Sequence, residues 1–231
     1  MAIPFTNTTL VRDVVNLSPK TSDVFKKHRI DFCCGGNRPI AEAAAERSVN
    51  IEELMNELAA VYEKSEESDE IKVWTNSSSE DIINHVIGRY HEPLREELKL
   101  LAPYVTKVAK VHGGNHPELI KVYELFNEIK SELLDHTAKE EASSFPLILM
   151  LEENPDIENK EEIIEEIRML ESEHDRSGNI MKQIREVTNN FALPIDACGT
   201  YTLVYKRLEM LESDLFMHVH LENNILFPRY L

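Results

Sequence analysis

Glycine is scarce in this sequence, with 7 residues among 231, and the chain has no long uninterrupted run of apolar residues. Few glycines together with many helix-forming residues favour an all-helical protein. The longest apolar stretches, such as 147–151, are far too short to cross a bilayer, so we expect no membrane-spanning segment. The start of the chain lacks a basic segment followed by an apolar one, so we expect no targeting peptide.

Basic side chains are in the minority. The 25 Lys and Arg residues face 42 Asp and Glu residues, which gives a formal net charge of −17. Nucleic acid and anionic membrane surfaces both call for a basic face, so we expect neither as a partner. The acidity is uneven, because residues 1–62 carry 7 basic and 8 acidic groups whereas residues 63–231 carry 18 and 34. This change of composition indicates a domain boundary.

Cysteine is also rare. The sequence has three, two of them adjacent, which is too few for a disulfide-stabilised secreted domain. We therefore expect a cytoplasmic protein. With 42% hydrophobic residues over 231 positions, the chain is large enough to bury a core as one large domain or two smaller ones.

Helical patterns and turn residues divide the chain into two predicted domains. A small helical unit is expected over 1–62, followed by a charged, serine-rich linker at 63–79 and a bundle domain over 80–231. The bundle domain contains four long helical patterns separated by Gly and Pro residues, over 80–111, 117–150, 160–190 and 198–226. Four long helices with modest connections predict an up-down-up-down four-helix bundle in an all-α protein.

One pattern occurs twice in the predicted bundle. The segments at 136–146 (HTAKEEASSFP) and 218–228 (HVHLENNILFP) each contain His, then Glu four residues later, then Phe-Pro. A spacing of four residues places the His and the Glu on one face of a helix. We predict that each copy supplies two metal ligands and a phenylalanine that closes the site, and that the proline helps to end the helix.

The apolar stripe of each predicted bundle helix passes through a histidine, and two stripes also pass through a glutamate one turn later. These stripes give six candidate metal ligands: His91, His136, Glu140, His174, His218 and Glu222. The remaining histidines lie off these stripes, and we expect surface or supporting roles for them: His28, His85, His112, His116 and His220.

Six inward-facing polar side chains need partners. A single buried histidine is usually satisfied by a carbonyl, and a single His–Glu pair usually lies on a solvated face. Six unpaired buried groups at about 1–3 kcal/mol each would remove most of a domain's roughly 5–15 kcal/mol of stability. A metal centre resolves this conflict. Four imidazoles and two carboxylates are too many for one tetrahedral zinc ion and suit iron or manganese, with the carboxylates bridging two ions.

The sequence resembles the repair-of-iron-centres family of di-iron proteins. The segments that carry the resemblance are DFCCGGN at 31–37, RYHEPLREEL at 89–98, ELLDHTAKEEASSFP at 132–146, MLESEHDRSG at 169–178 and DLFMHVHLENNILFP at 214–228. The resemblance covers nearly the whole chain and implies a haemerythrin-like C-terminal bundle. It also implies two non-haem iron ions with an oxo or hydroxo bridge, the four histidines as terminal ligands and the two glutamates as bridges.

The same resemblance implies a cytoplasmic homodimer that repairs iron–sulfur clusters damaged by oxidative and nitrosative stress. The implied partners are damaged iron–sulfur proteins and small gases, namely nitric oxide and oxygen. Iron donation and nitric oxide reduction are both open as mechanisms, so an enzymatic activity stays undecided at this point. One alternative is a haemerythrin-like protein that binds or senses oxygen or nitric oxide. Another is an interaction protein whose metal only stabilises the bundle.

One position departs from the pattern of oxygen-carrying haemerythrins. Those proteins have an extra histidine one turn from the ligand on the third bundle helix, whereas His174 is flanked at that spacing by Leu170 and Gly178. One ligand fewer is expected to leave the iron ions more open. This favours reactivity or iron release over reversible oxygen storage.

The adjacent cysteines Cys33 and Cys34 lie in a predicted glycine-rich turn. Adjacent cysteines form only a strained disulfide, so we do not expect a permanent structural bridge. A thiol pair can exchange disulfides or bind iron, whereas an incidental pair of small side chains is the simpler alternative. The family resemblance favours a redox or iron-handling role. Cys198 is expected to open the last helix and to serve packing.

Overall fold

The computed structural model describes residues 3–66 and 74–231, and within these ranges the regular structure is helical apart from an isolated bridge between Leu10 and Pro39. The all-α fold expected from the sequence is therefore confirmed. Among the described helices, none combines the length and the apolar character that a bilayer crossing demands.

The chain forms two compact units. We call Met1–Ile82 with Met217–Leu231 the N-terminal unit, and Ile83–Phe216 the bundle unit. Both boundaries fall inside helices, α5 (Ser79–Val86) and α10 (Gly199–Leu221), so these two helices contribute residues to both units.

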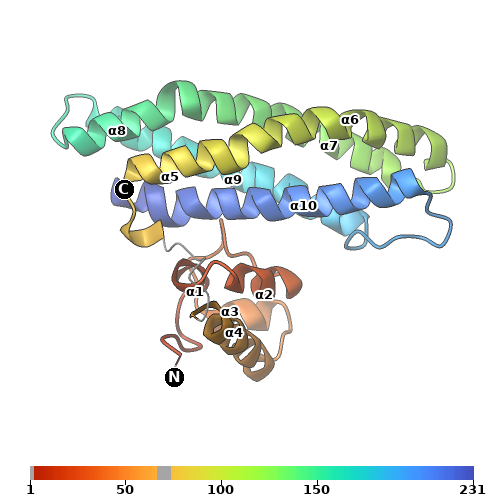
Figure 1. The fold of residues 1–231 in the computed structure, drawn as a ribbon, viewed down its shortest axis with the longest axis horizontal. Coiled ribbons are helices and arrows are strands. Elements are labelled where there is room, and N and C mark those ends of the chain that lie inside the picture. The colour runs from red at the N-terminus through yellow and green to blue at the C-terminus, as the bar shows by residue number, and fades with distance from the viewer. Residues whose placement is uncertain (1–2, 67–73) are drawn as a thin grey trace. The chain divides into compact units, whose positions relative to one another are not determined.

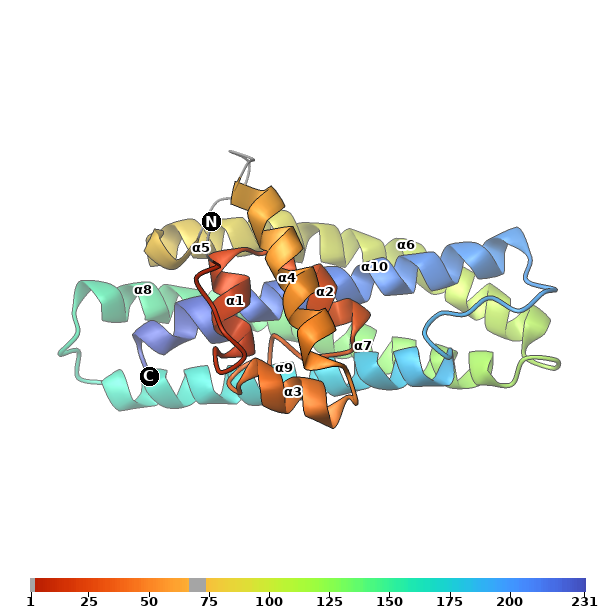
Figure 2. The same ribbon diagram turned by 90° about the horizontal axis from the view of Figure 1, so that it is seen from below.

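The N-terminal unit contains four helices that lie together (Figures 1 and 2): α1 (Val11–Leu17), α2 (Thr21–Lys27), α3 (Ile40–Glu46) and α4 (Ile51–Glu66). The Asn50 side chain caps α4, because its Oδ1 accepts the backbone N–H of Glu52 at 2.9 Å. Of the expected linker at 63–79, α4 covers the first residues and 67–73 lie outside the described residues, so the linker stays a prediction. A short 3₁₀ turn (Trp74–Asn76) precedes α5.

The long helices of the bundle unit run alongside each other with alternating direction (Figure 1). They are α6 (Glu92–His112), α7 (Glu118–Lys139), α9 (Lys160–Val187) and the part of α10 up to Phe216, with α8 (Phe145–Glu153) continuing the line of α7. This is the arrangement predicted from the four helical patterns. The stripes that the sequence assigns to the core are buried, including Leu98, Leu133, Leu170 and Leu211.

At one end of the bundle unit, the loop before α10 contacts the turn between α6 and α7. His116 Nε2 lies 3.0 Å from Asp196 Oδ1. The hydrogen bond with Asp196 raises the pKa of His116 above 6.5, with Glu118 adding its charge. The contact between His116 and Asp196 therefore stabilises the folded protein fully below the ordinary histidine pKa. This stabilisation is lost as the pH rises through the raised pKa of His116.

We expect this raised pKa to appear in a pH titration of the imidazole followed by NMR. Asp196→Asn removes the largest cause and should bring the His116 midpoint back toward 6.5. Asp156→Asn, which changes an exposed aspartate in another loop, serves as the control. An unchanged His116 midpoint in Asp196→Asn would contradict the contact.

Candidate metal centre

Three of the long helical segments are interrupted by a π-helical turn. These turns are η2 (Ile87–His91), η3 (Glu140–Ser144) and η4 (Glu222–Leu226). A π turn adds one residue to the helical repeat and often occurs at functional sites. One turn ends at a predicted ligand and the other two begin at one, so the irregular backbone coincides with the residues singled out from the sequence.

The π turns explain the repeated sequence pattern. In each copy the glutamate carbonyl accepts a hydrogen bond from the phenylalanine five residues later, Phe145 to Glu140 and Phe227 to Glu222. The proline then follows the closed turn. Because proline has no N–H and needs space beside the preceding turn, the wider π turn accommodates it. The expectation that Pro146 helps to end its helix is wrong, since α8 continues to Glu153.

The bundle unit brings four of the six predicted ligands together. His91, His136, Glu140 and His174 are all at most 5% exposed. Glu140 lies at the middle of the group, with its Oε1 3.1 Å from Nε2 of His136 and its Oε2 3.4 Å from Nε2 of His91. His174 Nε2 is 3.7 Å from Glu140 Oε1. The phenylalanine of the first copy, Phe145, stacks on the His91 ring at 5.8 Å.

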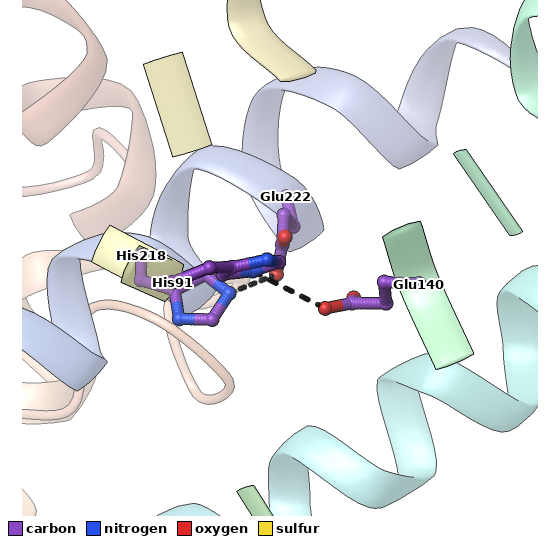
Figure 3. Close-up of side chains that lie close together, drawn as sticks. All are labelled: His91, Glu140, His218 and Glu222. Carbon is purple, nitrogen blue, oxygen red and sulfur yellow. Dashed lines mark ion pairs between the residues drawn. The ribbon is translucent and has the colours of Figure 1, made fainter. Parts of the chain in front are cut away.

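The N-terminal unit holds the other two predicted ligands. His218 and Glu222 are buried, and His218 Nε2 lies 3.0 Å from Glu222 Oε2. Figure 3 draws this ion pair and the pair between His91 and Glu140, both as dashed lines. In every one of these contacts the histidine atom that faces the carboxylate is Nε2. This is the nitrogen that would bind a metal.

Two carboxylates that the sequence analysis missed orient the histidines. Glu141 Oε1 lies 2.9 Å from Nδ1 of His91, and Glu173 Oε2 lies 2.7 Å from Nδ1 of His136. Such carboxylates fix the proton on Nδ1 and leave the Nε2 lone pair for a metal. Glu141 Oε1 also accepts a hydrogen bond from Nη1 of Arg95 at 2.6 Å. Each directly adjoins a predicted ligand in the sequence, which is the signal that could have identified them.

The donor set of the bundle unit fits a cation. Both carboxylate oxygens of Glu140 are buried and accept no hydrogen bond from the described residues. The Nε2 atoms of His136 and His174 lie only 2.8 Å apart. With the His136 proton held on Nδ1 by Glu173, a His174 that carries its proton on Nε2 can donate it to His136 Nε2 when no metal is bound. A metal ion would accept both nitrogens and a carboxylate oxygen together.

Electrostatics keep Glu140 ionised. Burial by itself would raise the pKa of this carboxyl, but the positive charge that His136 and His174 carry when they are protonated outweighs it and holds the pKa well below its usual range. A carboxylate that stays charged while buried is the form that bridges metal ions.

We expect Glu141→Gln to lower iron affinity by about 10- to 100-fold, because the neutral amide holds the Nδ1 proton of His91 less firmly. Competition with a coloured iron chelator measures the affinity. Glu96→Gln, which changes an exposed glutamate on α6 next to Arg95, is the control. Equal affinities for the two variants would contradict the orienting role of Glu141.

A surface pocket of about 240 Å³ reaches His136. Its lining includes three carboxylates, from Glu132, Asp135 and Glu173, together with Lys139 and Arg176. The pocket thus brings the edge of the candidate ligand His136 close to the surface, where Lys139 and Arg176 pair with Glu173 and Glu132.

The remaining predicted residues lie in other surroundings. Cys33 is buried and Cys34 is half-buried, in the turn after α2, while Cys198 is exposed with its Sγ 3.2 Å from Nε2 of His112. Gly36 allows the cysteine turn to close, because a Cβ there would lie 2.5 Å from the Phe32 carbonyl oxygen.

The other histidines lie outside the candidate ligand set. His220 is buried in the N-terminal unit, where burial lowers its pKa to about 4. Its Nδ1 lies 3.1 Å from the carbonyl oxygen of Phe32. His28 forms a surface pair with Glu57, and the His85 ring packs edge-on against Tyr90.

Comparison with known proteins identifies the class. Residues 82–230 match the hemerythrin HHE cation binding domain, and residues 7–62 match a domain of unknown function, DUF542. The chain is thus a haemerythrin-like cation-binding protein with an additional N-terminal domain. It belongs to the iron–sulfur cluster repair proteins, as the recognised segments implied.

Its relatives match over almost their full length. The iron-sulfur cluster repair protein ScdA of Staphylococcus haemolyticus is 38% identical over 97% of this chain and 99% of its own. The iron-sulfur cluster repair protein YtfE of Escherichia coli is 36% identical over 92% of both chains. A probable iron-sulfur cluster repair protein of Haemophilus influenzae is 35% identical, again over 92% of both.

Proposed function

We propose that the six buried residues bind two non-haem iron ions joined by an oxo or hydroxo bridge. The ligands are His91, His136, Glu140, His174, His218 and Glu222, with the two glutamates as bridges. Three observations support this: the repeated His–Glu pattern, the presentation of Nε2 to a carboxylate in each ion pair, and the match to a cation-binding domain. The continuous helix α10 carries the chain from the bundle unit to His218.

The protein uses this centre to repair iron–sulfur clusters damaged by oxidative and nitrosative stress. The observation that carries the proposal is Glu140, a buried, ionised carboxylate with no hydrogen bond from the described residues and three imidazoles around it. Relatives with 35–38% identity are named as iron–sulfur cluster repair proteins. Iron supplies the redox and Lewis-acid chemistry when it is bound.

The protein's own residues favour donation of iron to the damaged cluster. Glu141 and Glu173 hold the protons on the distal nitrogens, so His91 and His136 bind metal as neutral ligands. Leu170 and Gly178 supply no donor atom where another histidine would close the coordination sphere. A surface pocket lined in part by carboxylates reaches His136, one of the proposed ligands. Together these features describe a site that binds iron and also releases it.

Reactivation of a damaged cluster tests the proposal. A hydro-lyase with a [4Fe–4S] cluster is inactivated by peroxide and then incubated with iron-loaded protein, with iron-free protein or with the matching amount of free iron. We expect recovery with the loaded protein to exceed that with free iron when a chelator is present. Equal recovery with iron-free protein would contradict the proposal.

Consumption of nitric oxide separates the alternatives. Reduced, iron-loaded protein is mixed with two equivalents of nitric oxide, the number needed to form one nitrous oxide with the two electrons of the two ferrous ions. Nitric oxide is followed with an electrode and nitrous oxide by gas chromatography. Turnover to nitrous oxide would indicate a reductase instead of an iron donor. Reversible uptake without cluster repair would indicate the gas-binding alternative.

The protein is further proposed to act in the cytoplasm as a homodimer. The three cysteines are free, as expected in a reducing compartment. Light scattering on the full chain tests the dimer, and a monomer mass at micromolar concentration would contradict it.

A further inference from the structure

The peptide group between the two adjacent cysteines is hydrogen-bonded at both of its polar atoms. Its N–H, from Cys34, donates to Asp31 Oδ1 at 3.1 Å. Its carbonyl, from Cys33, accepts from Nδ2 of Asn224 at 2.8 Å. Both partners belong to the N-terminal unit. The orientation of this one peptide group therefore decides whether both bonds are made.

The segment of chain that contains Glu222 contacts two successive carbonyl groups of the cysteine turn, those of Phe32 and Cys33. Asn224 follows Glu222 by two residues in the π turn η4, and His220 precedes it by two. His220 contacts the carbonyl oxygen of Phe32 and lies 2.9 Å from Asn16 Oδ1 through its Nε2. A change in the cysteine turn thus acts directly on the residues that flank a proposed iron ligand.

Disulfide formation between adjacent cysteines would change this peptide group. The two sulfur atoms lie 3.8 Å apart, whereas a disulfide needs about 2.05 Å. The ring that closes contains the Cys33–Cys34 peptide itself, so the peptide must turn or distort to let the sulfurs meet. The hydrogen bond from Asn224 to the Cys33 carbonyl is then lost or weakened. The hydrogen bond from Asn224 to the Cys33 carbonyl consequently favours the dithiol form over the disulfide form.

We propose that Asn224 couples the thiol–disulfide state of Cys33 and Cys34 to the π turn that carries Glu222. The inference deepens the proposed function and rests on it where iron retention is concerned. In the dithiol form Asn224 holds the turn against the Cys33 carbonyl. In the disulfide form this contact is released and the turn around Glu222 opens more readily. Coupling of this kind is reciprocal, so a change at Asn224 must also shift the redox equilibrium of the cysteines.

The oxidant is a small-molecule disulfide. The thiolate of Cys34, the more accessible of the two sulfurs, attacks one sulfur of the reagent and releases its first thiolate. Cys33 then attacks the Cys34 sulfur and releases the second. Two electrons pass from the cysteines to the reagent, which leaves as two thiols with the two cysteine protons.

The two cysteines differ in a way that supports this order. A hydrogen bond to Cys34, burial and the Asp31 charge together raise the pKa of the Cys33 thiol. Cys33 is therefore the poorer first nucleophile. Its Sγ lies 3.3 Å from Asp31 Oδ1, which is placed to receive the thiol proton in the second step.

The test measures the thiol–disulfide equilibrium of iron-free, full-length protein. A Cys198→Ser background leaves Cys33 and Cys34 as the only cysteines that can be oxidised. Parent and Asn224→Ala proteins are equilibrated in mixtures of oxidised and reduced dithiothreitol, trapped by alkylation and quantified by mass spectrometry. Loss of one hydrogen bond specific to the dithiol should raise the disulfide-to-dithiol ratio roughly two- to tenfold. Asn127→Ala removes a similar side-chain bond, to the Tyr123 carbonyl, and is the control.

A second variant and a second measurement complete the test. Asn224→Asp keeps the size but sets an acceptor against the Cys33 carbonyl, so it should shift the ratio in the same direction. Hydrogen exchange of the amides at 222–227 should be faster in oxidised than in reduced parent protein. An unshifted ratio in both variants, or identical exchange in the two parent forms, overturns the inference.

Iron retention separates this inference from the proposed function. Oxidised parent protein should lose iron to a chelator faster than reduced protein, and Asn224→Ala should remove the difference. Equal rates in oxidised and reduced parent protein overturn the coupling to the metal. If the parent binds no iron while the redox shift and the exchange difference are observed, the proposed centre fails and the coupling of Asn224 to the turn stands.

Discussion

Glu140→Gln is expected to remove most of the bound iron. The amide keeps the shape of the side chain but loses the charge that faces His91, His136 and His174. Since even an orienting residue changes metal affinity by about 10- to 100-fold, loss of the proposed bridging ligand should lower iron content at least tenfold. Elemental analysis of protein purified without oxygen measures this.

The control for Glu140→Gln is Glu124→Gln, which changes an exposed residue on the helix that precedes Glu140. Circular dichroism should show the same helical content for both variants, because a neutral amide relieves a buried charge and does not disturb the packing. A fully iron-loaded Glu140→Gln protein would refute the central position of this carboxylate.

Arg185→Ala is expected to destabilise the bundle unit by about 3 kcal/mol. Glu212 is fully buried, and the Arg185 Nε lies 2.7 and 2.9 Å from its two carboxylate oxygens. The guanidinium also lies over the Phe191 ring at 4.8 Å. Removing one partner leaves a buried carboxylate without its counter-charge, which typically costs 3–5 kcal/mol, and the partial exposure of Arg185 places the effect near the lower end.

Urea unfolding of the iron-free full chain measures this effect. Arg168→Ala, which breaks an exposed pair with Glu165 on the same helix, should change stability by less than about 0.5 kcal/mol. The double change Arg185→Met with Glu212→Leu should recover most of the loss, since no buried charge is left. Equal stabilities of Arg185→Ala and Arg168→Ala would show that the buried pair contributes little.

The four-helix bundle was predictable because the apolar residues of its helices recur at a regular spacing in the sequence. Apolar residues at helical spacing and breaks of Gly and Pro define α6, α7, α9 and α10 closely. The burial of the six His and Glu side chains followed from the same periodicity. Each of these inferences needs only local sequence and the geometry of one helix.

The π turns were not predictable from periodicity. Two of them, η3 and η4, nevertheless coincide with the repeated Glu-x4-Phe-Pro pattern. A search that assumes one helical repeat treats Glu140 and Phe145 as neighbours on successive turns, whereas they close a wider turn. The expectation that Pro146 ends a helix failed for the same reason. An interruption of the repeat can be recognised only once the backbone hydrogen bonds are known.

By itself, the sequence determined the helical class, the four long helices of the bundle and the six inward-facing side chains, because each depends on spacing along a single helix. Only the tertiary structure decided which carboxylates orient the histidines and which side chain holds the Cys33 carbonyl. Glu141 and His91 are 50 residues apart, and Asn224 and Cys33 are 191 apart. Contacts between distant segments depend on how elements pack, and no local pattern contains that information.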